Sequence, residues 1–312
     1  MPHRPLYQRV LLTGANGLVG QALVERLSGI PEVDLLATSR DPGPRFATGS
    51  CGYTPLDVTD ADAVRRLFLD FAPSAVINCA ALTRVEQCDR EKERCWTTNV
   101  DAVAALARAC KAQGARLVQL STDFVFDGTD GPYGERDHPH PINYYGRSKL
   151  ASENAVRTAG LRRWTVIRTA LGFGTGERLS RGNFGLFLVE RLRAGEPTLI
   201  CTDQVRSPTY VPDLADGIAR AVLRDRTGIY HLSGREILST FDFARRLAER
   251  FDFDPELFQP TTTAALHPNA PRPLKTGLLI LKAETELGYK PRTLEQALDH
   301  FGRRLGLPVA AP

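Results

Sequence analysis

The sequence lacks the cysteine and histidine patterns that mark metal and redox sites. No C-x-x-C pair occurs, so neither a zinc ribbon nor a dithiol redox motif is indicated. The histidines show no spacing typical of metal ligands, so we predict no metal site. We expect reduced thiols for all the cysteines, which are scattered: Cys51, Cys79, Cys88, Cys95, Cys110 and Cys201.

Long apolar runs and an excess of one charge are absent as well. No run approaches the ~18 residues that span a bilayer, and residues 1–8 lack the apolar core of a signal peptide. Lys and Arg number 40 against 36 Asp and Glu, without a long basic block. We therefore expect a cytoplasmic protein that binds neither nucleic acid nor a membrane.

Over the first half of the chain, short apolar segments alternate with segments whose apolar residues recur at helical spacing. Such an alternation is typical of a doubly wound α/β fold with a parallel (Rossmann) sheet covered on both faces. The expected strands are 9–13, 33–39, 53–56, 74–81, 116–122 and 165–170. The first expected helix opens at the glycines of 14–20 and ends at residue 27. Three further helices are expected over 60–71, 92–113 and 145–158.

The alternation loosens beyond Gly172, where we expect helices over 184–194 and 211–223 and a returning strand over 228–232. The pattern predicts two parts. A dinucleotide-binding Rossmann domain comprises residues 1–173 and returning segments at about 210–235. A smaller C-terminal substrate-binding lobe comprises 174–209 and 239–312.

A glycine-rich turn, G-A-N-G-L-V-G, connects the first expected strand to the first helix. Glycines at this place let the backbone approach a pyrophosphate, and the free N–H groups of the helix N-terminus bind its charge. A turn that binds nothing is the less favoured alternative. The predicted cofactor-binding residues of this turn are Gly14, Asn16, Gly17, Leu18, Val19 and Gly20.

The end of the second expected strand favours one cofactor over another. Ser39 and Arg40 stand there, and an arginine at this place accommodates a 2′-phosphate, so the sequence predicts NADPH. Asp41 keeps NADH open, because a carboxylate accepts from a ribose 2′-OH. After the third strand, Asp57 is placed to accept from the adenine amino group, with Val58 beside it.

Tyr145 and Lys149 stand four residues apart at the start of a predicted helix, so both leave the same face. A nearby ammonium favours the phenolate and lowers the pKa of a tyrosine. Such a tyrosine can donate a proton to a carbonyl oxygen. Thr122 ends the fifth expected strand, where its hydroxyl can bind the same oxygen, and we predict these three as catalytic residues.

Several segments together resemble a known family. They are T-G-A-N-G-L-V-G (13–20), N-C-A-A-L-T-R-V-E (78–86), S-T-D-F-V-F-D-G (121–128) and N-Y-Y-G-R-S-K-L (143–150). The chain resembles the extended short-chain dehydrogenases/reductases, and among them the dTDP-4-dehydrorhamnose reductase group. The resemblance implies NADPH-dependent reduction of a 4-keto-6-deoxy sugar nucleotide, a step of dTDP-rhamnose biosynthesis.

The resemblance also implies roles for individual residues. Tyr145 is the general acid, Lys149 positions the nicotinamide ribose, and Asn99 has the structural role of holding the active-site helix through backbone contacts. Further cofactor contacts are Cys79, Ala80, Ala81 and Thr83. The substrate contacts are Val85, Glu86, Thr122, Asp123, Tyr145 and Arg206.

Three positions depart from the family pattern. Leu171 stands where the family has an aromatic residue, Arg206 replaces a glycine, and Lys275 replaces an asparagine. Both cations add charge where a nucleotide diphosphate would lie, and the alternative for each is a solvated cation at the surface.

Two other functions stay open. One is a catalytically silent NADP-binding subunit that resembles the β subunit of methionine adenosyltransferase. The other is a sugar-nucleotide epimerase or dehydratase that retains NAD. A homodimer is also left open.

Overall fold

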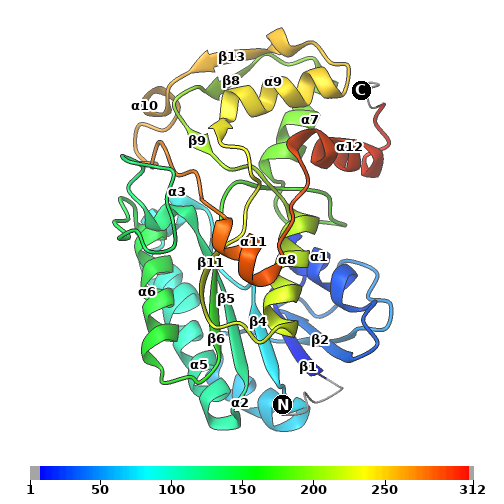
Figure 1. Ribbon diagram of the computed structural model, residues 1–312, viewed down its shortest axis with the longest axis vertical. Coiled ribbons are helices and arrows are strands. Elements are labelled where there is room, and N and C mark those ends of the chain that lie inside the picture. The colour runs from blue at the N-terminus through cyan, green and yellow to red at the C-terminus, as the bar shows by residue number, and fades with distance from the viewer. Residues whose placement is uncertain (1–7, 309–312) are drawn as a thin grey trace.

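The computed structural model describes residues 8–308, so the first residues of the chain and the last four of the expected lobe lie outside it. A seven-stranded sheet forms one half of the molecule (Figure 1), in the order β11-β6-β5-β4-β1-β2-β3. Its strands are β1 (Gln8–Thr13), β2 (Val33–Ser39), β3 (Gly52–Pro55), β4 (Ala75–Asn78), β5 (Arg116–Thr122), β6 (Trp164–Thr169) and β11 (Gly228–His231).

All neighbouring strands of this sheet are parallel. The strand order reverses at β1, which pairs with β2 on one side and with β4 on the other. Ligands of open α/β sheets bind in the crevice outside the carboxyl ends of the strands at such a reversal. The glycine turn follows β1, and the 79–83 segment follows β4, so both flank this crevice.

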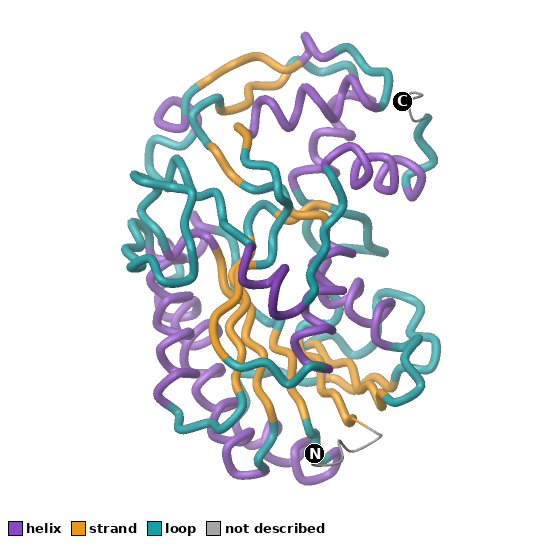
Figure 2. Tube along the Cα trace, in the orientation of Figure 1, coloured by secondary structure: helices purple, strands orange, loops and turns teal. Residues whose placement is uncertain are grey.

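Helices cover both faces of the sheet, because its strands are apolar on both sides (Figure 2). Val10 and Leu12 of β1 face one apolar core, and Leu11 between them faces the other. The helices of the first core are α1 (Leu18–Leu27), α8 (Val211–Leu223) and α11 (Leu281–Leu287). The helices of the second are α2 (Ala61–Phe71), α5 (Ala102–Gln113) and α6 (Tyr144–Thr158).

A second half, at the top of Figure 1, has an apolar core of its own around Phe173, Phe243 and Phe301. Its larger elements are α7 (Phe184–Ala194), β8 (Thr198–Cys201), α9 (Thr240–Arg250), β13 (Phe258–Thr261) and α12 (Leu294–Arg304). Its short elements are β7 (Gly172–Phe173), β9 (Val205–Arg206), β10 (Thr209–Tyr210), β12 (Leu238–Ser239) and α10 (Thr263–Leu266). The division into two domains stays a prediction.

The expected fold is confirmed, but the prediction of one helix is wrong. The expected helix over 92–113 is broken into α4 (Lys92–Trp96), a π-helical turn (Thr97–Asp101) and α5, and α3 (Val85–Arg90) precedes it. The wide turn carries Asn99, which is buried and brackets Leu82: it accepts from Leu82 N at 2.8 Å and donates to Leu82 O at 2.9 Å. Periodicity alone does not show such a turn.

The fourth expected strand, over 74–81, is shorter than predicted, because β4 ends at Asn78. Asn78 donates to the Gln119 side chain at 2.7 Å, and the chain beyond it leaves the sheet. Cys79 N still donates to Thr13 O of β1 at 3.2 Å, and Cys79 and Ala81 both line the crevice. Within residues 8–308, no helix has the length and apolar character needed to cross a bilayer.

Candidate active site

A cavity of about 670 Å³ lies between the glycine turn, the ends of β4 and β5, the start of α6 and the second half of the molecule. Most of the predicted site residues line it: Gly14, Asn16, Gly17, Leu18, Val19, Gly20, Cys79, Ala81, Thr83, Val85, Glu86, Thr122, Asp123, Tyr145, Lys149 and Arg206. Those that do not are Ser39, Arg40, Asp57, Val58 and Ala80. Ser39 ends β2, Arg40 follows it, and Asp57 and Val58 follow β3.

The glycine turn has the geometry of a phosphate cradle. Gly14 has φ +69°, and a Cβ atom there would lie 2.7 Å from Ala80 N. A Cβ atom on Gly20 would overlap the Gly14 carbonyl. Gly17 is the N-cap of α1 and has no side chain that could accept from the first N–H groups of the helix. These residues fit a dinucleotide pyrophosphate.

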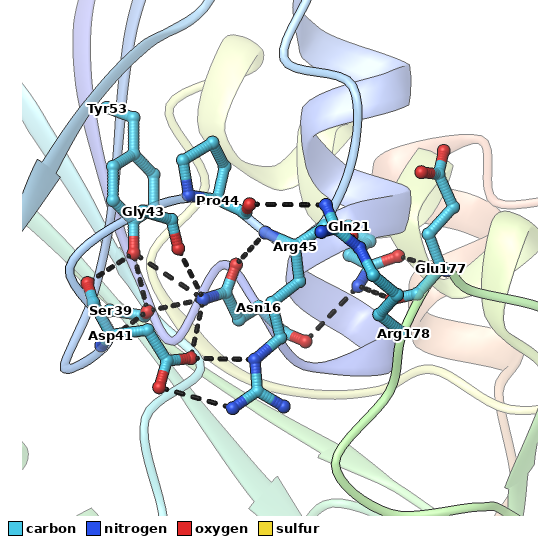
Figure 3. A network of polar contacts seen from close by, with 10 residues as sticks. All are labelled: Asn16, Gln21, Ser39, Asp41, Gly43, Pro44, Arg45, Tyr53, Glu177 and Arg178. Carbon is cyan, nitrogen blue, oxygen red and sulfur yellow. Dashed lines mark hydrogen bonds and ion pairs between the residues drawn. The ribbon is translucent and has the colours of Figure 1, made fainter.

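Asn16 organises the end of β2 (Figure 3). Its Nδ2 donates to Ser39 Oγ at 2.8 Å and to Asp41 Oδ2 at 2.7 Å, and its Oδ1 accepts from Arg45 N at 3.0 Å. The hydrogen bond from Asn16, together with Arg45, holds the pKa of Asp41 below its usual value. The carboxylate that kept NADH open is therefore already engaged, whereas Arg40 is exposed.

Residues of the segment 174–183 are hydrogen-bonded to α1 and to the loop after β2, which the sequence did not predict (Figure 3). The Gln21 side chain accepts from Glu177 N at 2.8 Å and donates to Glu177 O at 2.9 Å. Arg178 donates to Arg45 O at 2.9 Å. These contacts join residues more than 130 positions apart, so no local pattern reports them.

The catalytic candidates meet at the cavity. Lys149 Nζ donates to Leu120 O at 2.6 Å, and burial lowers the pKa of Lys149 to about 8. Burial raises the pKa of Tyr145, and a hydrogen bond with Thr122 acts in the opposite direction. The expectation of a more acidic phenol is therefore wrong for this structure, because desolvation of the phenolate outweighs its neighbours.

A buried ion pair lies behind Lys149. Glu153, one helical turn further along α6, accepts from Arg168 Nε at 2.9 Å and Nη2 at 2.7 Å and from Ser121 Oγ at 2.5 Å. Both partners of the pair are almost fully buried. The Glu153 charge acts against the burial of Lys149 and raises the pKa of its amine.

Asp123 and Arg206 form a second buried pair. Arg206 Nη1 donates to Asp123 Oδ2 at 2.6 Å, and both side chains are 3% exposed. Of the other two departures from the family pattern, Leu171 lines the cavity, with φ +38°. Lys275 is exposed and does not line it.

Three arginines that the sequence did not single out also line the cavity: Arg84, Arg181 and Arg272. Arg181 donates to Thr83 Oγ1 at 2.7 Å across the cavity, and Arg272 pairs with Glu86. Arg84 lies inside the N-C-A-A-L-T-R-V-E segment, so this motif could have identified Arg84 as a site residue. The other two come from distant segments without a recognisable motif.

A glycine cradle at the strand reversal, with a tyrosine and a lysine of one helix facing the same cavity, defines a class. The protein has the fold of the extended short-chain dehydrogenases/reductases, as the sequence predicted.

Comparison with known proteins gives the family. The model of the RmlD substrate binding domain matches residues 8–306, so the chain belongs to that family. The dTDP-4-dehydrorhamnose reductase of Mycolicibacterium smegmatis is 37% identical over 298 residues, which cover 94% of this chain and 84% of the relative. The methionine adenosyltransferase 2 subunit beta of Danio rerio is 33% identical over 275 residues, covering 86% and 81%.

Solved structures agree with this assignment. The crystal structure of dTDP-4-dehydrorhamnose reductase from Bacillus anthracis, in complex with NADP, superposes with a TM-score of 0.83 at 28% identity. The superposition covers 96% of this chain and 99% of that one.

Proposed function

We propose that this protein is an NADPH-dependent reductase of a 4-keto-6-deoxy sugar nucleotide, acting in dTDP-rhamnose biosynthesis. The observation that carries the proposal is that Thr122, Tyr145 and Lys149 face the same cavity as the glycine cradle. The name of the Mycolicibacterium smegmatis relative, which aligns over nearly the whole chain, supports the substrate class. When bound, NADPH supplies a hydride to the carbonyl carbon.

Tyr145 is the proton donor for the carbonyl oxygen. A pKa raised by burial keeps the phenol protonated at neutral pH, as a donor requires. The Thr122 hydroxyl favours the phenolate that forms after proton transfer, because its hydrogen bond lowers the pKa of Tyr145. Lys149 holds the nicotinamide ribose with an ammonium group that is positioned by the Leu120 carbonyl.

The remaining cofactor contacts follow the chain from β1 to β4. The glycine turn binds the pyrophosphate, and Ser39 and Arg40 bind the adenosine ribose and its 2′-phosphate. Asp57 and Val58 would hold the adenine. Beyond β4, the contacts are Cys79, Ala80, Ala81 and Thr83.

The sugar nucleotide occupies the part of the cavity between the two halves of the molecule. Val85, Glu86 and Asp123 face the sugar. The positive charges of Arg181 and Arg272 suit the diphosphate, because charge-assisted hydrogen bonds from arginine bind phosphates strongly.

The test is turnover. Purified protein is mixed with NADPH and dTDP-4-dehydro-6-deoxy-L-mannose, and the absorbance of the reduced nicotinamide is followed. Loss of absorbance that needs both compounds, with a reduced sugar nucleotide as product, supports the proposal. Bound NAD that survives purification, with no net consumption during turnover, identifies an epimerase or dehydratase instead.

A second candidate is a catalytically silent NADP-binding regulatory subunit. Relatives named methionine adenosyltransferase 2 subunit beta align over most of this chain at 31–33% identity. NADPH binding without turnover of any keto sugar, together with co-purification of a methionine adenosyltransferase, would favour this candidate.

The proposal includes a cytoplasmic location and a homodimer. The six cysteines are free, which suits a reducing compartment. Cell fractionation tests the location, and light scattering of the purified protein tests the oligomeric state.

A further inference from the structure

Arg206 lies where three distant segments meet beside the cavity. Asp123 follows the end of β5, Arg206 ends β9, and Thr276 comes from the chain that precedes α11. All three side chains are buried. The sequence placed Arg206 at the substrate, but both terminal nitrogen atoms of its guanidinium group have partners within the protein.

The guanidinium group binds three acceptors. Nη1 donates to Asp123 Oδ2 at 2.6 Å and also contacts the Thr276 hydroxyl at 2.5 Å, and Nη2 donates to Pro273 O at 2.9 Å. The Thr276 hydroxyl itself lies 2.5 Å from Asp123 Oδ2. The same carboxylate oxygen is thus fixed by groups from two other segments. A planar guanidinium bridges such acceptors in one geometry, unlike an ammonium.

The other oxygen of Asp123 reaches the catalytic threonine. Thr122 Oγ1 donates to Asp123 Oδ1 at 3.1 Å and accepts from Phe124 N at 3.2 Å. Thr122 has a single hydroxyl hydrogen, so the position of the carboxylate governs whether that hydrogen stays on Asp123 or turns to donate to Tyr145 or to a bound carbonyl oxygen.

A second contact leads to the tyrosine. The guanidinium carbon of Arg206 lies 4.6 Å from the centre of the Phe124 ring. Phe124 in turn packs edge-on against Tyr145, with ring centres 5.8 Å apart. Arg206 thus supports Thr122 through Asp123 and Tyr145 through Phe124.

We propose that Arg206 is a positioning residue for Thr122 and Tyr145, and that it does not bind the diphosphate of the substrate. This inference rests on the proposed function for its kinetic consequences. Its structural content, that Arg206 holds Asp123 and Phe124 in place, does not depend on turnover.

The kinetic test compares Arg206→Met, Arg206→Lys and Thr276→Val with the wild type. For Arg206→Met, we expect kcat to fall about 100-fold, the effect of a small misplacement of catalytic groups, while KM for the sugar nucleotide changes less than about threefold. Arg206→Lys restores part of kcat, because an ammonium neutralises Asp123 but cannot bridge all three acceptors. A rise in KM of about tenfold or more with kcat retained would show a diphosphate ligand and overturn the proposal.

Thr276→Val keeps the ion pair, so it tests the network if Arg206→Met does not fold. We expect a several-fold lower kcat at unchanged KM. Unchanged kcat in both Thr276→Val and Arg206→Lys would contradict the proposal.

Two measurements separate this inference from the proposed function. Calorimetric titration with dTDP reports whether Arg206→Lys and Thr276→Val keep the affinity of the wild type, as we expect. Crystal structures of wild type and variants report the distance from Thr122 Oγ1 to Asp123 Oδ1. An absence of turnover in the wild type would reject the reductase function alone. Unmoved Asp123, Thr122 and Phe124 side chains in the variants would reject the positioning role.

Discussion

The cavity has two walls that are built in different ways. The sheet wall comes from the ends of β4 and β5 and from the turns and helices that come after β1, β4 and β5 in the chain, and it carries the glycine cradle, Thr122 and Tyr145. The lobe wall comes from segments around 171–184, 204–206 and Arg272. The first wall is made by consecutive strand–turn–helix units, whereas the second is made by contacts between segments far apart in the chain.

This difference between the walls indicates which of them determines the chemistry and which determines substrate selectivity. Backbone geometry fixes the sheet wall, because parallel strands place successive turns at one edge. Side-chain pairs such as Asp123 with Arg206, and Arg181 with Thr83, connect the lobe wall to it. We therefore expect changes on the sheet wall to affect chemistry and cofactor binding, and changes on the lobe wall to affect substrate affinity, with Arg206 as an exception.

The largest effect is expected for Tyr145→Phe on the sheet wall. Removing the proton donor should lower kcat about 1,000-fold, within the usual range for general acid catalysis. NADPH affinity, measured by fluorescence titration, should change less than about threefold because the ring is kept. A variant that retains a tenth of the wild-type kcat would show that another group donates the proton.

Gly20→Ala tests the backbone geometry of the same wall. The added Cβ would overlap the Gly14 carbonyl, and such overpacking costs about 1–3 kcal/mol. We expect a lower free energy of unfolding in urea and about tenfold weaker NADPH binding. Gly29→Ala is the matched control, because a Cβ there meets no atom within 4 Å. Equal behaviour of the two variants would refute the close packing inferred for the turn.

The two walls also differ in how far the sequence predicts them. Alternating apolar segments predicted the sheet, since strand and helix periods are local properties. The glycine turn and the spacing of Tyr145 and Lys149 are local as well. The raised pKa of Tyr145 was not predicted, because it depends on burial in the folded protein.

Long-range features of the site could not be predicted from local patterns. The contact of Gln21 with Glu177 and the pairing of Asp123 with Arg206 join residues 156 and 83 positions apart. The π-helical turn at Asn99 interrupts a helix whose apolar period continues on both sides. In each case, tertiary contacts determine the outcome.

Arg181→Met tests the lobe wall. If Arg181 binds the diphosphate, losing one charge-assisted hydrogen bond should raise KM about tenfold and leave kcat within about threefold. Lys275→Met is the matched control, because Lys275 is an exposed cation that does not line the cavity. Its KM should stay within about twofold of the wild type. An equal rise in both variants would indicate a general effect of charge rather than a contact of Arg181.

The smallest effect is expected in the pH dependence of NADPH affinity, which involves Lys149 of the sheet wall. The pKa of Lys149 is lowered to about 8, so the ammonium is present below that pH and is lost as the pH rises through it. NADPH affinity should therefore fall about fivefold between pH 7 and pH 9, a loss of about 1 kcal/mol that is typical of a single ion contact. In Lys149→Met, the affinity should be lower and nearly independent of pH over this range.

The unfolded chain keeps this lysine protonated up to its ordinary pKa, so deprotonation of the folded state stabilises the wild type as the pH rises above 8. In urea unfolding, the free energy of unfolding of the wild type should consequently rise relative to that of Lys149→Met above pH 8. If general unfolding caused the weaker cofactor binding, the wild type would instead lose stability over this range.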